Sequence, residues 1–195
     1  MVIMENISKN ITYAEAIHSS TAKRERIDNT PSPSQIESMK LLSEKIFQPL
    51  RDWVGGPIKI NSFFRSAALN DKIGGASSSQ HCKGQAMDID DVYGCKSNAE
   101  MYHWIKENLN FDQMIWEFGT DTQPNWIHVS YVSDEDNRNK CLKAYKEYNN
   151  TKYKVIWKVL KEQCEELQKQ KVQLKVEKEI QYLGNMEKVL IRELV

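Results

Sequence analysis

The sequence predicts an α+β fold, in which a small antiparallel sheet is flanked by helices and followed by a helical C-terminal tail. Apolar residues recur at spacings of three and four over residues 34–53, the period of a helix that buries one face. Four short segments have the alternation or the apolar run that is typical of strands. From about Asn139 the composition changes to lysine, glutamate and glutamine without proline, which favours a helix.

The longest helix of the domain is expected to begin after the proline-rich break at residues 29–33, with Ser34 as its cap. Pro49 falls late in this segment and is expected to kink or end the helix. Its apolar positions are Ile36, Met39, Leu42, Ile46 and Leu50.

Two shorter helices are marked by capping residues. Thr12 precedes a short helix over residues 12–18, with Glu15 three residues later. Ser97 and Glu100 form the same pattern at the start of a helix over residues 97–108. Residues 65–79 are small, polar and glycine-bearing, so we expect a short helix followed by a loop.

The predicted strands lie between these helices. In the second of them, alternation places Ala86, Asp88 and Asp90 on one face. The last two strands are joined by a polar loop that ends at Asn125. The four segments are residues 58–64, 84–90, 113–117 and 126–131.

The C-terminal segment divides the chain into a domain of residues 1–145 and a helical extension of residues 146–195. Leu160, Leu167 and Leu174 recur every seven residues, but Gln163 and Gln170 occupy intermediate core positions. A coiled coil is therefore weakly specified. A solvated helix that packs on the domain or on a partner is the favoured interpretation, and any self-association is expected through this tail.

Composition excludes several classes of partner. Lysine plus arginine and aspartate plus glutamate both number 27, so no global basic field indicates nucleic-acid binding. The mean hydropathy is −0.64, and no apolar run approaches the roughly 20 residues that cross a bilayer. The N-terminus has no signal-peptide pattern, so we expect synthesis in the cytoplasm. The four cysteines form no CxxC pair and are interpreted as free thiols.

Three residues are candidate metal ligands. A catalytic zinc takes three ligands from His, Asp or Glu and keeps one position open. His81 ends a loop, Asp88 lies on the following strand, and His128 lies on a strand 40 residues later. Gly84 between the first two allows close approach of the backbone. His18 and His103 have no acidic or histidine neighbour at ligand spacing.

The motifs around these residues resemble a known family. The segments SQHCKGQAMD and WIHVS, with the upstream SFFRSAALNDKIGGASSSQH, are similar to the M15 family of zinc D-Ala-D-Ala carboxypeptidases and phage endolysin peptidases. The resemblance covers roughly residues 5–140. It implies the D-Ala-D-Ala peptidase (hedgehog-like) fold and one zinc held by His81, Asp88 and His128. It also implies that Arg65 binds a substrate carboxylate or carbonyl, and that Ser79 hydrogen-bonds the substrate backbone.

One position departs from the family pattern. Many members carry an acidic residue three positions before the last histidine, as the base that activates water. Here that residue is Asn125, which has no basic form. Glu117, at the end of an apolar strand expected to pair with residues 126–131, is the preferred base. Asp121 and Asp90 are the alternatives.

The expected function is zinc-dependent cleavage of peptidoglycan stem peptides, as a D-Ala-D-Ala carboxypeptidase or an endopeptidase. The expected place of action is the bacterial cell wall, reached on lysis or from a virion. The alternative is a non-catalytic wall-binding or virion structural protein that keeps the fold, and Asn125 is the feature in its favour.

Overall fold

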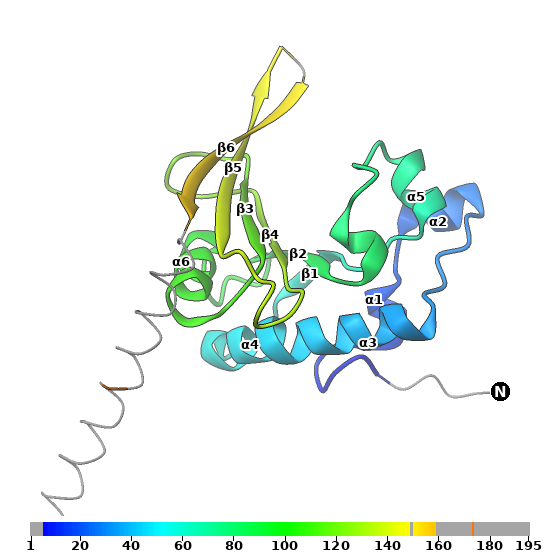
Figure 1. Cartoon of the computed structure of the whole chain (residues 1–195), viewed down its shortest axis with the longest axis horizontal. Coiled ribbons are helices and arrows are strands. Elements are labelled where there is room, and N and C mark those ends of the chain that lie inside the picture. Colours follow the sequence, from blue (N-terminus) through cyan, green and yellow to red (C-terminus); the bar gives the residue numbers. More distant parts are fainter. Residues whose placement is uncertain (1–5, 149, 159–172, 174–195) are drawn as a thin grey trace, which may run out of the picture. The chain divides into compact units, whose positions relative to one another are not determined.

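A computed structural model describes residues 6–148, 150–158 and 173 of the 195-residue chain. These residues, apart from 173, belong to a unit that extends to Lys158. Figure 1 shows its helices and a single sheet. The helices are α1 (Tyr13–Ala16), α2 (Ser20–Glu25), α3 (Pro33–Leu42), η1 (Ser43–Phe47), α4 (Gln48–Val54), α5 (Ala67–Lys72), η2 (Gln80–Lys83) and α6 (Asn98–Asn108).

The sheet has six strands in the order β1-β2-β4-β3-β5-β6. Every neighbouring pair is antiparallel except β3 and β5, which are parallel. The α+β class is confirmed, and the sheet is larger than expected and mixed. The strands are β1 (Lys59–Ser62), β2 (Ala86–Asp90), β3 (Gln113–Glu117), β4 (Trp126–Ser130), β5 (Lys140–Glu147) and β6 (Asn150–Lys158).

Capping side chains set the helix starts. Thr12 and Ser97 cap α1 and α6 as expected, and Ser97 and Glu100 complete a capping box. The cap of α3 is Ser32 rather than Ser34, because Pro33 occupies the first helical position and Gln35 closes the capping box. The short helix α2 was not expected from the sequence, since its polar residues show no apolar period.

Pro49 does not end the long helix. The turn before it widens into the π-helical segment η1, in which the Gln48 N–H donates to the carbonyl of Ser43, five residues earlier. A π-turn relieves the clash between a proline ring and the carbonyl four residues before it. The helix therefore continues as α4 to Val54.

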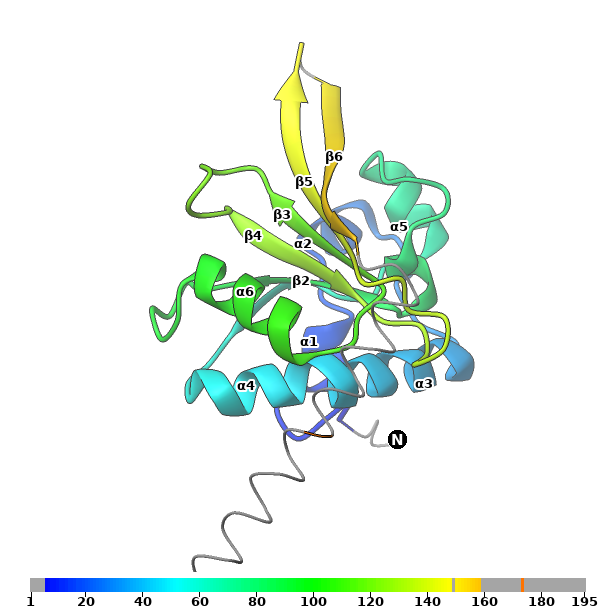
Figure 2. The ribbon, with the colours of Figure 1, turned by 60° about the vertical axis from the view of Figure 1, so that its left-hand side comes forward.

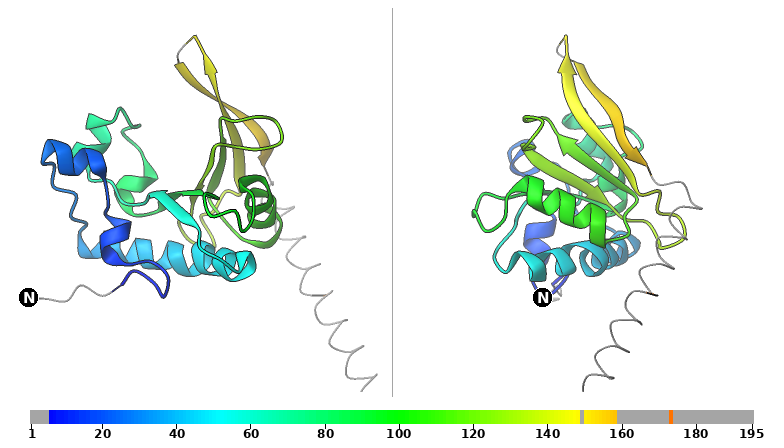
Figure 3. Two further views of the ribbon diagram at one scale, coloured as in Figure 1. Left: turned by 180° about the vertical axis from the view of Figure 1, so that it is seen from behind. Right: turned by 90° about the vertical axis from the view of Figure 1, so that its left-hand side faces the viewer.

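The helical tail predicted from residue 146 is wrong over residues 146–158. There β5 continues to Glu147 and β6 pairs with it from Asn150 to Lys158. Figures 2 and 3 show the end of β5 and the start of β6 extending beyond β3 as a two-stranded ribbon. Thr151, Tyr153 and Val155 are residue types that favour strands, and they outweigh the lysines between them. The proposed heptad, Leu160 to Leu174, lies outside the described residues.

The two faces of the sheet have different roles. One face packs against η1, α4 and α6 and forms the main core. Figures 1 and 3 show α6 and α5 on opposite sides of the sheet. Among the residues described, no helix is long and apolar enough to span a bilayer. The strand residues buried on the core face are Ile60, Met87, Ile89, Met114, Trp116, Ile127, Val129 and Cys141.

Candidate functional site

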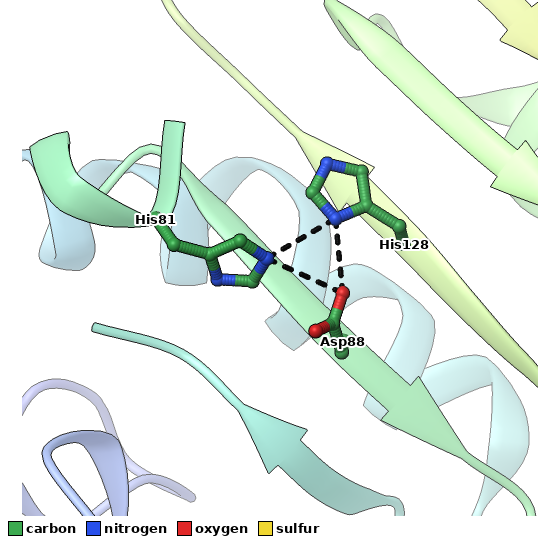
Figure 4. A group of neighbouring side chains, drawn as sticks. All are labelled: His81, Asp88 and His128. Atoms are coloured by element: carbon green, nitrogen blue, oxygen red, sulfur yellow. Dashed lines mark hydrogen bonds and ion pairs between the residues drawn. The ribbon is translucent and has the colours of Figure 1, made fainter. Parts of the chain in front are cut away.

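His81, Asp88 and His128 converge on the face opposite the main core. Each offers a ligand atom that lies within 4.8 Å of the other two. Asp88 and His128 are directly opposite each other in the β2–β4 register, so their side chains point to the same face. His81 reaches them from η2, the turn that precedes β2. Figure 4 shows the three side chains pointing toward a common centre.

The contacts among the three groups are short. His81 Nε2 lies 3.2 Å from His128 Nδ1 and 3.3 Å from Asp88 Oδ1. His128 Nδ1 lies 2.9 Å from the same carboxylate oxygen. Burial tends to raise the pKa of Asp88, but the charges and hydrogen bonds of His81 and His128 outweigh it and hold that pKa well below its usual range. Asp88 is therefore a carboxylate at neutral pH.

Backbone contacts fix the orientation of His81. Its Nδ1 lies 2.6 Å from the carbonyl oxygen of Phe63, and because a carbonyl only accepts, Nδ1 carries the proton. The other ring nitrogen, Nε2, faces Asp88 and His128 and is the one available to a metal when the imidazole is neutral. Such a carbonyl partner is typical of metal-binding histidines. Gly84 ends the turn at φ +69°, and a Cβ there would lie 2.5 Å from the Gln35 carbonyl oxygen.

Arg65 adjoins the cluster from the segment after β1. Its Nη2 donates to Asp88 Oδ2 at 2.6 Å, and its Nε donates to Ser62 Oγ at 2.8 Å. Oδ1 of the same carboxylate is the oxygen that faces the histidines. Arg65 therefore orients a candidate metal ligand, and it also lines the groove described below.

Glu117 lies on the face of the sheet that carries the cluster. It pairs with Trp126, two residues before His128, so the Glu117 and His128 side chains share this face. Only 7% of the residue is exposed. Burial raises the pKa of Glu117 to about 7; the charge of Asp88 adds to this, while those of His128 and Arg65 act against it. A buried carboxyl group with this pKa is suited to proton transfer near neutral pH.

The alternative bases lie elsewhere. Asp121 is exposed, pairs with Lys143, and lines a smaller cavity that Trp116 of the core face also lines. Asp90 accepts hydrogen bonds from Asn61 and Asn98 and does not line the groove. Neither carboxylate is placed to serve the cluster.

Asn125 is linked to Glu117 through the backbone. Its side chain is exposed, and its N–H donates to the Glu117 carbonyl at 2.9 Å. The residue that replaces the usual acid is thus a neighbour of the buried carboxylate.

A groove of about 1100 Å³ runs over the cluster. Ser79 lines it, and the Ser79 hydroxyl does not cap η2.

His103 lies away from the groove, on α6 beside Trp116, which belongs to the opposite face of the sheet. Cys82, Cys95 and Cys141 are free thiols, as expected.

Several groove residues were not found by sequence reasoning. Arg138, Lys146, Thr151 and Tyr153 all line the groove. Lys146, Thr151 and Tyr153 lie on β5 and β6, in the segment that was interpreted as helical, and Arg138 lies just before β5. The alternation of residues 151–156 was the signal that could have revealed the strand that carries Thr151 and Tyr153.

Comparison with known proteins agrees with the geometry. No curated protein gives a significant match to the chain. A family model described as peptidase M15 matches residues 9–130, which include the three clustered residues, Arg65 and Glu117. The match covers more than half of the sequence, and the chain belongs to the peptidase M15 family.

Proposed function

We propose that the protein is a zinc-dependent peptidase that cleaves the D-amino-acid-containing stem peptides of bacterial peptidoglycan. Membership of the peptidase M15 family supports a metallopeptidase. The observation that carries the proposal is the convergence of two imidazoles and one carboxylate in a groove that also contains the buried carboxyl group of Glu117.

The donor set fits zinc. Two histidines and one aspartate are ligands that catalytic zinc takes, and a fourth position would remain for water or substrate. The proton on His81 Nδ1 leaves Nε2 free to bind a metal, and Arg65 leaves Asp88 Oδ1 free in the same way. When bound, zinc supplies electrophilic activation of the peptide carbonyl and of water.

Glu117 is the proposed proton carrier. Its carboxylate would take a proton from the attacking water and return it to the leaving amine. The position of Glu117 on the neighbouring strand, with its side chain on the face of His128, supports this role.

Arg65 and Ser79 are the proposed substrate-binding residues. The guanidinium of Arg65 has donors beyond those used by Asp88 and Ser62, and these would bind a substrate carbonyl or carboxylate. The Ser79 hydroxyl, which lines the same groove, would bond the substrate backbone.

The rival proposal is a wall-binding or virion structural protein without activity. Asn125 favours it, since the usual acid is missing. The buried Glu117 in the groove favours the enzyme, because a carboxyl group there costs free energy unless it has a use.

Digestion of purified peptidoglycan, with and without a chelator, tests the proposal. Mass spectrometry should show new peptide ends, whose formation stops on chelation and returns with zinc. Wall binding without release of any peptide would instead support the rival. Action on lysis or from a virion, and self-association through the tail, stay predictions.

A further inference from the structure

We propose that Arg138 forms a subsite for a carboxylate of the peptide substrate, at the end of the groove away from Glu117. This inference rests on the proposed peptidase function and adds a recognition element to it. Arg138 lies beyond residues 9–130, which the family model matches. The groove is lined by Arg138 as well as by the clustered metal-binding residues.

The sheet register places Arg138 relative to the cluster. On β3, Ile115 is opposite His128, and Glu117 lies two residues beyond it. Asp112 lies three residues before Ile115, and its carboxylate holds Arg138. At about 3.3 Å per residue, Asp112 is roughly 10 Å along the strand from the level of His128. Arg138 and Glu117 are therefore on opposite sides of the cluster. About three extended substrate residues would span the roughly 10 Å between the level of His128 and that of Asp112.

Arg138 is held by a buried carboxylate. Asp112 is 2% exposed, and its two oxygens accept from Arg138 Nε and Nη2 at 2.6 Å each. Gln80, the residue before His81, donates to the same carboxylate at 2.8 Å. Burial tends to raise the pKa of Asp112, but Arg138 and Gln80 outweigh it and lower that pKa. The guanidinium thus has a fixed, charged partner behind it.

The outer edge of this guanidinium remains available. The Arg138 side chain is 52% exposed, and its bonds to Asp112 use Nε and Nη2. Within the described part of the chain no hydrogen-bond partner of Nη1 is found. An arginine fixed in this way presents its remaining donors to a carboxylate with little loss of side-chain entropy.

Other charges in the groove are differently placed. Arg65 is turned toward Asp88, and Lys146 donates to Thr151 and lies over the Phe118 ring. The acidic Asp136 also lines the Arg138 end, where it accepts a bond from Ser133. Of the two arginines in the groove, Arg138 is the one that does not contact a clustered residue.

The test compares one peptide mixture in two forms. Stem peptides from purified peptidoglycan are used with free carboxylates, or after amidation with ammonia and a carbodiimide. The variant combines Arg138→Gln with Asp112→Asn, so that no buried carboxylate loses its partner. Lys146→Gln is the control, since it removes a cation at the other end of the groove.

We expect the wild-type protein to prefer the acidic peptides by about 10–100-fold in kcat/KM, the worth of a charged hydrogen-bonded pair. The double variant should reduce this preference to about twofold or less through KM, and the control should keep it. The proposal would be overturned if the double variant kept the wild-type ratio of kcat/KM for acidic over amidated peptides. It would also be overturned if only Lys146→Gln lost this preference.

Binding of the same two peptide forms, measured by calorimetry, needs no cleavage. If the wild-type protein cleaves neither form, the proposed peptidase function fails, and the calorimetric comparison still decides the subsite. Equal wild-type affinity for both forms would overturn it. Tighter wild-type binding of the acidic form, absent from the double variant, would support it.

Discussion

Arg65 and Asp88 form an ion pair in which the two oxygens of the Asp88 carboxylate have different partners. Oδ2 accepts from the guanidinium at 2.6 Å, and Oδ1 faces His81 and His128. The side chains of Arg65 and Asp88 are only 17% and 12% exposed, so water competes little for the pair. Arg65 therefore contacts the candidate metal-binding cluster and also lines the groove beside it.

Arg65→Gln should weaken zinc binding by about 10–100-fold, the usual effect of losing a partner that orients a ligand. Competition with a chelating dye measures this. Arg51→Gln, on α4 and outside the groove, is the matched control and should leave the affinity unchanged. Unaltered zinc affinity with a raised KM would assign Arg65 to the substrate alone.

Glu117→Gln should keep zinc and lower turnover by roughly 10²–10⁴, the worth of a positioned acid–base group. The amide fills the same space but has no basic form. Asn125→Ala should cost much less, since the Asn125 side chain is exposed and its bond to Glu117 comes from the backbone. Steady-state kinetics with matched zinc content decides between them. Near-full activity of Glu117→Gln would remove this residue from the mechanism.

The pH profile should show the ionisation of Glu117. Since the base must be deprotonated, kcat/KM should rise with pH along a limb centred no higher than the pKa of about 7, because bound zinc would lower that pKa. In Glu117→Gln this limb should disappear from the residual activity. A limb of the same midpoint in the variant would assign it to another group.

The same ionisation should affect stability without metal. The folded-state pKa of Glu117 is raised above its ordinary value of 4.5 to about 7, so the folded chain holds more protons between these limits. The free energy of unfolding should therefore fall as pH rises through this window. Denaturant unfolding at pH 5 and pH 8 should show a smaller fall for Glu117→Gln. Equal falls in both proteins would show that burial does not perturb this group.

Gly84→Ala should destabilise the protein and weaken zinc binding. Gly84 ends the turn that positions His81. An added Cβ would meet the Gln35 carbonyl oxygen at 2.5 Å and Met39 Cγ at 2.8 Å, both on α3. Gly94→Ala is the matched control, because Gly94 has nearly the same φ and nothing within 4 Å of its Cβ position. We expect Gly84→Ala to cost roughly 1–3 kcal/mol more in thermal unfolding. Equal losses would mean that backbone strain alone matters at both positions.

Truncation should be tolerated after Lys158 but not after Asn150. Residues 1–158 keep β6 on the edge of the sheet, whereas residues 1–150 expose the length of β5. We expect the longer fragment to fold and bind zinc, and the shorter one to aggregate or melt earlier. Size-exclusion chromatography and thermal unfolding compare them. An unfolded 1–158 fragment would show that the remaining residues complete the core.

Local signals in the sequence sufficed for the caps at Thr12 and Ser97 and for the first four strands. Cap patterns and alternation act over a few residues, so they can be read without knowledge of the fold. The convergence of His81, Asp88 and His128 depends on the pairing of β2 with β4, which no local pattern encodes. The resemblance to a family, not spacing, made that prediction specific.

The helix predicted after Asn139 was wrong over the described residues for a physical reason. Lysine and glutamate favour helices in isolation, but Leu142 and Ala144 pack on Ile115 of β3, and this tertiary contact outweighs local propensity. The parallel pairing of β3 with β5 is equally absent from local patterns. Arg138 was missed for the same reason, since it lies next to this unrecognised strand.

The clustered residues and the outer groove residues come from different parts of the sheet. The clustered residues and Glu117 come from η2, β2, β4 and β3, while Arg138, Lys146 and Tyr153 come from the later hairpin and the segment before it. Under the proposed function, substitutions on the hairpin would alter peptide recognition without replacing a candidate metal ligand. If the proposed function holds, exchange of residues 132–158 between homologous chains should change peptide preference while His81, Asp88 and His128 keep their places.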